Sequence, residues 1–259
     1  MLFTQLIRGN LNTKLIGNKI EYYQRLDSTN KEAINLIEEN LISSGTIILT
    51  DYQFDGKGRN KNKWFSSAGK SVTFSLFIKP NFSIKKLSLL PLATGLAVAN
   101  TLKKFNIETS LKWPNDIFIK TKKCGGILIE SKIHNKEIKY LVIGIGLNVN
   151  EDEFDSSIEN KATSLFIEKK TPIQRELIIA WILNELEVLI NMLNNNNENI
   201  KINWTKLCNH INKKVRFLDN KEIKKGIFLG VNQIGEAIIK EENKKIILTK
   251  NDNIKILNY

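Results

Sequence analysis

Two glycines, several cations and a tryptophan are crowded into one short segment of the chain. Residues 53–64 have the sequence QFDGKGRNKNKW and lie between two apolar, strand-like runs. Glycine lets backbone N–H groups approach an anion, and the cations can neutralise its charge. Trp64 could form the wall of an apolar ligand site, although a solvated basic loop with a buried tryptophan has the same composition. The segment is not a Walker loop, because no Gly-Lys-Ser/Thr sequence opens a helix.

Three further motifs place polar groups or glycines at strand ends. KWPND, residues 112–116, puts Asn and Asp after a proline that interrupts a strand, although such residues are also typical of turns. KCGGIL, residues 123–128, puts a cation before two glycines, which would suit either a flat ligand or a hairpin turn. GIGLNVN, residues 144–150, lacks side chains at two alternate strand positions, which indicates close packing or a nearby ligand. Each motif alone is also compatible with an ordinary turn or strand.

In this order, after DSTN at residues 27–30 and before a β-rich tail, the motifs resemble those of biotin protein ligases. These enzymes biotinylate acetyl-CoA carboxylase, and the resemblance covers nearly the whole chain. It implies that the biotin carboxylate attacks the α-phosphate of ATP, giving biotinyl-5′-AMP and pyrophosphate with Mg²⁺ assistance. A lysine of a biotin carboxyl carrier protein domain then attacks the adenylate. Biotin and the ATP–Mg²⁺ complex are therefore the implied substrates, with no dedicated protein site for the metal.

The resemblance also implies roles for individual residues. The implied catalytic residues are Lys123, Arg59 and Asp116, and Asp116 could position or deprotonate the acceptor amine, or help to hold Mg²⁺. The implied biotin-binding residues are Ser28, Thr29, Gln53, Gly56, Lys57, Trp64, Lys123, Gly125 and Gly126. The implied residues for ATP or the adenylate are Lys57, Arg59, Lys112, Asn115, Lys123 and Asn148. Lys57 replaces a common arginine of the family and Lys61 a common glycine, which leaves open how the loop becomes ordered.

The apolar pattern predicts the elements that position these motifs. Strands are expected near residues 20–23, 46–51, 71–78, 109–113, 117–120, 126–133 and 140–148. Helices are expected near residues 30–40, 87–104 and 202–211, and a longer one begins with Thr171 as N-cap and Pro172 next. Thr29 is a candidate both for a helix cap and for a ligand contact, because Glu32 follows three residues later. Residues 151–170 lack periodicity and are expected to form a mobile loop.

Short strands joined by tight turns predict an α+β fold, a mixed or antiparallel sheet with helices mainly on one face. The resemblance makes this the class II synthetase-like fold of biotin ligase catalytic domains. From about residue 213 the pattern changes to five short β-type runs separated by Asn and Gly, the last at residues 253–257. We therefore predict a catalytic domain over residues 1–212 and a small SH3-like β-barrel over residues 213–259.

The chain has 259 residues and a net charge of +12. A basic protein suggests a nucleic-acid partner, but only five of its 39 cations are arginine, which base readout favours. A genome rich in AT would also explain the abundance of Lys, Asn and Ile. The sequence has no apolar run long enough for a membrane span and no visible signal peptide. Two cysteines, far apart, fit a reducing cytoplasm, so a cytoplasmic location is expected.

Two alternatives remain open. A lipoate ligase would share the catalytic fold and the adenylate chemistry, but its Gly-rich signature after two arginines is not found here, and the β-rich tail favours biotin. A non-catalytic nucleic-acid binder would use the positive charge. Because only 26 residues precede Asp27, too few for the winged helix-turn-helix domain of dual-function relatives, we expect a ligase without specific DNA binding, as a monomer or a homodimer.

Overall fold

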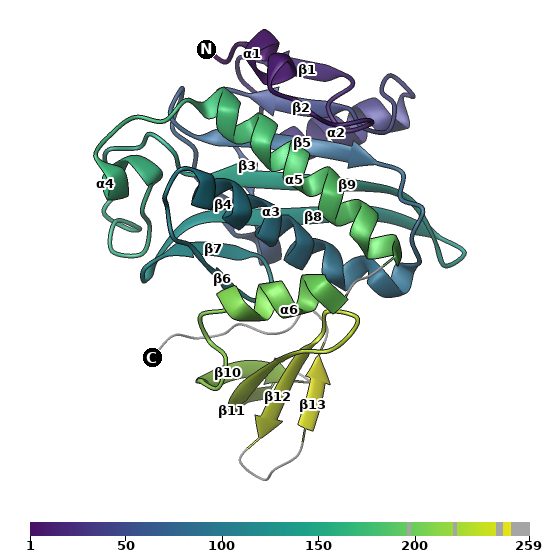
Figure 1. Cartoon of the computed structure of the whole chain (residues 1–259), viewed down its shortest axis with the longest axis vertical. Coiled ribbons are helices and arrows are strands. Elements are labelled where there is room, and N and C mark those ends of the chain that lie inside the picture. Colours follow the sequence, from purple (N-terminus) through teal and green to yellow (C-terminus); the bar gives the residue numbers. More distant parts are fainter. Residues whose placement is uncertain (196–197, 220–221, 242–245, 250–259) are drawn as a thin grey trace.

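A seven-stranded mixed sheet forms the centre of the protein. The structure is a computed structural model that describes residues 1–195, 198–219, 222–241 and 246–249. The strands are β1 (Ile20–Tyr23), β2 (Ile47–Thr50), β5 (Val72–Ile78), β6 (Ser110–Lys112), β7 (Asp116–Ile119), β8 (Lys122–His134) and β9 (Glu137–Leu147). Their order is β1-β2-β5-β9-β8-β7-β6, and only the β1–β2 pair is parallel (Figure 1). The predicted α+β fold with a mixed sheet is confirmed.

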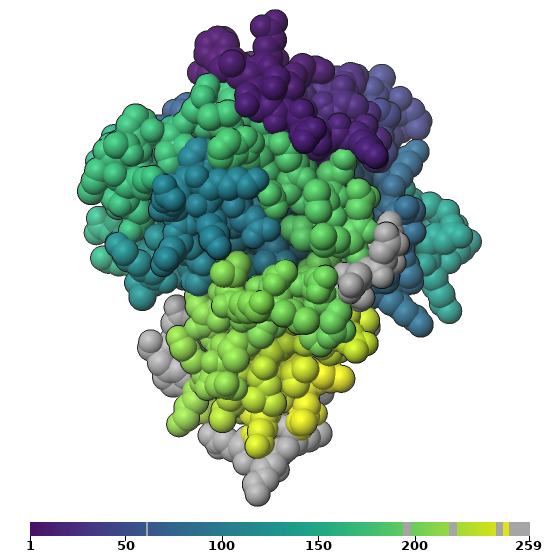
Figure 2. Space-filling view, in the orientation of Figure 1, coloured from purple at the N-terminus to yellow at the C-terminus, as the bar shows by residue number. Residues whose placement is uncertain are grey.

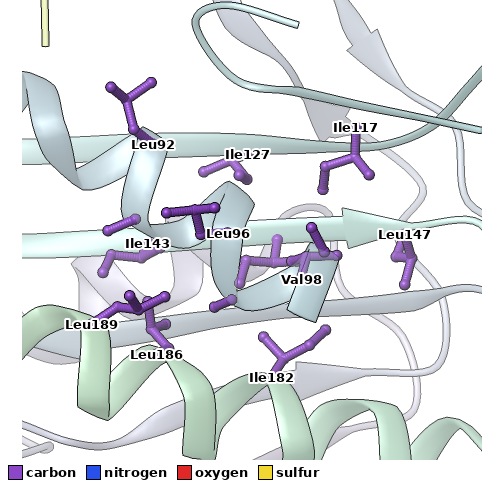
Figure 3. Close-up of a cluster of buried hydrophobic side chains, with 14 of the residues drawn as sticks. Leu92, Leu96, Val98, Ile117, Ile127, Ile143, Leu147, Ile182, Leu186 and Leu189 are labelled. Carbon is purple, nitrogen blue, oxygen red and sulfur yellow. The ribbon is translucent and has the colours of Figure 1, made fainter. Parts of the chain in front are cut away.

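Two long helices cover one face of this sheet. They are α3 (Leu90–Lys104), preceded by a 3₁₀ turn over Ile84–Leu89, and α5 (Arg175–Asn195). Figure 3 shows leucines and a valine of α3 and α5 packed on isoleucines of β7, β8 and β9. The other face carries α2 (Thr29–Glu38), whose Ala33 packs on Ile48 of β2. Since neighbouring residues of β2 point to opposite faces, Ile47 and Leu49 join the core under α3 and α5.

The start of α5 differs from the prediction. This helix begins at Arg175, so Thr171 is not its N-cap and Pro172 is not its first residue. The backbone N–H of Ile173 donates to Asn150 Oδ1, and Asn150 Nδ2 donates to the Ile173 carbonyl, both at 2.9 Å. This reciprocal pair binds the segment to the end of β9 in a non-helical conformation, so a tertiary contact overrides the local start signal.

Of the mobile loop predicted over residues 151–170, residues 151–163 do lie outside any helix or strand, but the end of the segment is helical. The segment contains α4 (Leu165–Lys169), and Ser164 Oγ accepts from the Ile167 backbone as an N-cap. Thr163, Ser164 and Leu165 are fully buried. The Thr163 carbonyl accepts from Asn148 Nδ2, which ties the segment to the sheet. The short helix α4 therefore depends on packing and on its side-chain cap. It does not depend on a periodic spacing of apolar residues, which is the signal that sequence analysis detects.

Glu151 is a buried carboxyl group beside this turn. It is 2% exposed, its Oε1 accepts from the Ser71 hydroxyl, and its Oε2 has no hydrogen-bond partner. Burial raises the pKa of Glu151 above its ordinary value of 4.5, although the hydrogen bond from Ser71 opposes the shift. Folding therefore favours the protonated form of Glu151 more than the unfolded chain does.

This shift predicts a pH-dependent stability that Glu151→Gln should remove. A raised pKa in the folded state stabilises the protein below the ordinary carboxyl pKa, and the benefit is lost as the pH rises through the raised value. Glutamine carries no charge at any pH, so the melting temperature of the variant should improve relative to wild type from about pH 4 to about pH 8. Thermal unfolding across this range is the measurement, and a difference that stays constant with pH would contradict the assignment.

A small antiparallel sheet follows the main one. After α6 (Glu198–Leu207) come β10 (Lys214–Asp219), β11 (Glu222–Val231), β12 (Ala237–Glu241) and β13 (Ile246–Thr249), paired in that order. Figure 2 shows this sheet, in light green and yellow, packed against the rest of the molecule. The predicted β-rich tail is confirmed, whereas its fifth run, residues 253–257, lies outside the described residues. The division into two domains at residue 212 stays a prediction. No helix in the described ranges is long and apolar enough to cross a membrane.

Candidate active site

A cavity of about 400 Å³ lies where five predicted motifs meet. It is lined by the start of α2, the segment 53–64, the turn between β6 and β7, and glycine-rich parts of β8 and β9. The predicted site residues in its lining are Ser28, Thr29, Gln53, Lys57, Arg59, Trp64, Lys112, Asn115, Asp116, Lys123 and Gly126. Residues from distant parts of the sequence are thus brought to one place.

Three predicted residues are not in this lining. Gly56 lines a second cavity, of about 520 Å³, which shares the Lys57–Lys63 segment with the first. At Gly125, an added Cβ would lie 2.9 Å from both the Gly146 carbonyl oxygen and Leu147 Cδ1, so this glycine serves strand packing. Asn148 is 5% exposed, donates its side-chain amide to Thr163 and its backbone N–H to the Cys124 carbonyl. Its contact with a nucleotide stays a prediction.

The glycine- and cation-rich segment forms a narrow ribbon. β3 (Gly56–Lys57) pairs with β4 (Lys63–Trp64), and the Gly58 N–H donates to the Asn62 carbonyl at 2.7 Å. The tip between them is a short 3₁₀ turn that starts at Arg59. Arg59 Nη1 donates to Asn115 Oδ1 at 3.4 Å, and Asn115 Nδ2 donates to the Ile127 carbonyl at 2.6 Å. Asn115 therefore links the ribbon tip to β8.

One end of the cavity is a polar network. The backbone N–H and the hydroxyl of Thr29 both donate to Gln53 Oε1, at 2.7 and 3.0 Å. Helix α2 begins at Thr29, and Ser28 precedes it as the N-cap. The prediction that Thr29 caps the helix is therefore wrong, because its hydroxyl donates to Gln53. Ser75 Oγ lies 2.7 Å from Thr29 Oγ1 and 2.5 Å from Asn30 Oδ1. Fixed donors and acceptors of this kind suit a ring with both N–H and C=O groups.

Trp64 forms an apolar wall over β9. An added Cβ at Gly146 would lie 2.5 Å from Trp64 Cε2 and 2.7 Å from Cζ2, so the indole ring lies on a strand position that must lack a side chain. Gly144 likewise makes room for the side chain of Asn30. The indole N–H of Trp64 and the hydroxyl of Thr73 are buried without partners, and both residues line the cavity. A bound molecule could satisfy these two groups.

Another part of the lining is cationic and forms a cationic end of the cavity. Lys123 Nζ forms an ion pair with Asp116 Oδ1 at 2.5 Å, and both side chains are partly exposed. Lys123 lies over Gly126, where an added Cβ would be 3.2 Å from Nζ. Lys112 lies near the Phe118 ring, 5.8 Å from its centroid. Lys57, Lys63 and Arg59 are also in the lining, and among the described residues that line the cavity only Asp116 carries a carboxylate, so the cavity favours a polyanion.

Residues of the small sheet and its turns contact the KWPND turn. Trp113 is 2% exposed, donates its indole N–H to the Gly235 carbonyl at 3.3 Å, and packs near the Phe228 ring. The Asn209 N–H donates to the Leu111 carbonyl in the preceding strand. The turn that carries Asn115 and Asp116 is therefore held between the two sheets.

Some residues that line the cavity were not predicted from the sequence. Asn30 and Thr73 are the clearest cases. Asn30 belongs to the DSTN motif, which could have indicated it, whereas Thr73 lies in an alternating strand and carries no local signal. Within the described part of the chain, no group of three or more His, Cys, Asp and Glu residues could hold a metal ion.

The chain is similar to several known proteins. A family model described as the biotin/lipoate A/B protein ligase family matches residues 22–148. The bifunctional ligase/repressor BirA of Bacillus subtilis is 36% identical over 180 residues, which are 68% of this chain and 55% of the relative. The chain thus spans about half the length of this relative. The biotin–[acetyl-CoA-carboxylase] ligase of Mycobacterium tuberculosis is 26% identical over 217 residues, covering 80% of this chain and 79% of the relative.

A solved structure extends the match to most of the fold. The biotin protein ligase of Aquifex aeolicus, in complex with biotin and ATP, superposes with a TM-score of 0.80 and 28% identity. The match covers 93% of this chain and all of the other. The match to the biotin/lipoate A/B protein ligase family thus spans just under half of the chain, and the fold extends the likeness to nearly all of it. The chain's resemblance to the biotin protein ligases of that family, expected from the motifs, is confirmed.

Proposed function

We propose that the chain is a biotin protein ligase, which makes biotinyl-5′-AMP from biotin and ATP and transfers biotin to a carrier-protein lysine. The observation that carries this proposal is that one cavity combines a polar network at Thr29 and Gln53, an apolar wall at Trp64, and cations at Arg59 and Lys123. Biotin carries the complementary groups, which are a ureido ring, an apolar middle and a carboxylate. The names of the relatives, and the biotin and ATP bound to the Aquifex protein, support the proposal.

In the first step, a carboxylate oxygen of biotin attacks the α-phosphorus of ATP, and the bond to the β-phosphate breaks. Pyrophosphate leaves with the Mg²⁺ that enters with ATP. Negative charge concentrates around the α-phosphate during this step, and fixed cations stabilise it. Lys123 is placed to do so, because its ammonium group is held beside Asp116 and can turn to an anion in the cavity. Arg59 adds a planar group that can bind two phosphate oxygens.

In the second step, a neutral lysine amine of the carrier domain attacks the acyl carbon of the adenylate, and AMP leaves. The attacking amine must lose a proton. Asp116 is the carboxylate in the cavity lining, and it is released as an acceptor when Lys123 moves to the phosphate. We therefore propose that Asp116 orients the amine and accepts its hydrogen bond, in preference to holding Mg²⁺.

Arg59→Gly should release the adenylate faster. Loss of the guanidinium removes a charged contact to the phosphate and the link from the ribbon tip to Asn115, and we expect release to be roughly tenfold faster or more. Released adenylate acylates any accessible amine, so biotin should appear on an unrelated protein such as albumin, measured by mass spectrometry. Arg8→Gly, at an exposed position of helix α1 (Thr4–Gly9), is the control. Labelling confined to the carrier domain would contradict this role.

The function is tested by ATP–pyrophosphate exchange with biotin, with lipoate and with neither acid. We expect exchange that depends on biotin. Exchange with lipoate alone would indicate a lipoate ligase instead of a biotin ligase, and the family description includes both. Absence of exchange, together with DNA binding that weakens steeply with salt, would instead favour a nucleic-acid binder.

The acceptor and the location belong to the same proposal. The acceptor we propose is the biotin carboxyl carrier domain of acetyl-CoA carboxylase, which the relative from Mycobacterium tuberculosis suggests by name. We propose a cytoplasmic location, since both cysteines are free, as is usual in a reducing compartment.

A further inference from the structure

The ribbon at the cavity, together with the chain that leads to and from it (residues 51–71), is hydrogen-bonded from its base to its tip. It leaves the main sheet at Asp51, after β2, and returns at Ser71, before β5. The Gly69 N–H donates to the Asp51 carbonyl at 3.2 Å, and Ser66 Oγ both accepts from the Gln53 N–H and donates to its carbonyl. The β3–β4 pair continues these contacts towards the tip. Each hydrogen-bonded pair of residues constrains the position of the next pair, so the geometry of the base determines where the tip lies.

One buried guanidinium joins the two sides of that base. Arg175 is the first residue of α5 and is 7% exposed. Its Nη1 donates to the Ser71 carbonyl at 3.0 Å, and its Nη2 donates to Asp51 Oδ1 at 2.9 Å. The base of the ribbon is thus fixed from a helix more than a hundred residues later in the sequence.

The partner carboxylate is itself held in place. Asp51 Oδ2 accepts from the Tyr22 hydroxyl and lies 3.5 Å from the terminal ammonium group of Met1. Burial alone would raise the pKa of Asp51, but the hydrogen bonds from Tyr22 and Arg175 outweigh it and keep the pKa below its ordinary value. Asp51 is therefore charged at neutral pH and cannot easily turn away from Arg175.

We propose that Arg175 is a positioning residue for the ribbon. By binding Asp51 and Ser71 at once, it fixes the spacing and direction of the two sides, and so places Trp64 over β9 and Arg59 at the cationic end of the cavity. Lysine cannot replace it, because a single ammonium group lacks the planar fork that reaches both acceptors. The consequence for the adenylate rests on the proposed function, whereas the consequence for the ribbon does not.

The test compares Arg175→Lys with Glu187→Gln in the full-length chain. Glu187 is on the same helix and accepts from the backbone N–H groups of Lys14, Leu15 and Ile16, far from the ribbon in sequence. Both changes weaken an anchor of α5, so a general loss of stability would affect both. The two readouts are tryptic cleavage within the ribbon, at Lys57 or Lys63, with and without biotin and ATP, and the release of preformed adenylate under single-turnover conditions. Melting temperatures establish that both variants are folded.

We expect Arg175→Lys to raise both rates roughly tenfold above those of Glu187→Gln, since a small misplacement distant from the chemistry has effects of that size or larger. Equal rates in the two variants would overturn the proposal. If Arg175→Lys does not fold, Asp51→Asn replaces it, and unchanged cleavage in that variant would also overturn the proposal. A wild-type protein without biotin-dependent exchange would refute the proposed function, while the cleavage of ligand-free protein would still decide the role of Arg175.

Discussion

Replacing Lys123 by methionine is expected to reduce biotin-dependent pyrophosphate exchange by roughly 100- to 1,000-fold. Losses of this size follow the removal of one fixed group that stabilises charge in a transition state. Methionine keeps much of the length of the side chain but cannot stabilise the α-phosphate. Lys123 and Asp116 are 38% and 27% exposed, so the ion pair adds little to stability, and the variant should fold normally.

Lys122→Met is the matched control for this variant. Lys122 is the adjacent residue of β8, but its side chain donates to the Glu159 carbonyl and is absent from the cavity lining. We expect its exchange rate to be within about threefold of wild type, as for a surface substitution. If Lys123→Met and Lys122→Met were equally active, Lys123 would not be the group that stabilises the adenylation step.

Gly146→Ala is expected to weaken biotin binding by roughly 100-fold. The new methyl group would occupy space within 2.5 Å of the Trp64 indole ring, which must therefore move towards the cavity. A displacement of about 1 Å at a binding group is sufficient for an effect of this size. Because the ring forms one wall of the site, the loss should appear in the dissociation constant of biotin, measured by calorimetry, more than in the melting temperature.

Gly95→Ala controls for the glycine-to-alanine change itself. Gly95 lies in the middle of α3, and its added Cβ would meet Leu111 Cδ2 at an ordinary 3.4 Å. Biotin affinity should be unchanged in this variant. Unchanged affinity in Gly146→Ala as well would mean that Trp64 does not contact biotin in the way proposed.

The motif residues could be predicted because their chemistry is local. Glycines, cations and a tryptophan within twelve residues indicate an anion site whatever the surrounding fold, and the structure brings Arg59, Lys112 and Lys123 to one cavity. The spacing of apolar residues, alternate in strands and on one face in helices, predicted the strands and the long helices for the same reason. The positions that were predicted well are those for which neighbouring residues carry the signal.

The remaining features depend on contacts across the fold. Thr29 has the spacing of a helix cap, but the side chain of Gln53 takes its hydroxyl. The reciprocal bonds between Asn150 and Ile173 delay the start of α5 in spite of a favourable Thr-Pro sequence. Arg175 looks like any helix-start residue until the structure places it against Asp51 and Ser71. No local pattern encodes such pairings, because their partners are distant in the sequence.

The most direct test of the central claim is a crystal structure of the protein grown with biotin and ATP. We predict biotinyl-5′-AMP in the cavity, with the ureido ring at Gln53 and Thr29, the thiophane ring against Trp64, and the phosphate in contact with Lys123 and Arg59. An adenylate in the reverse orientation, or a phosphate remote from both cations, would contradict the account.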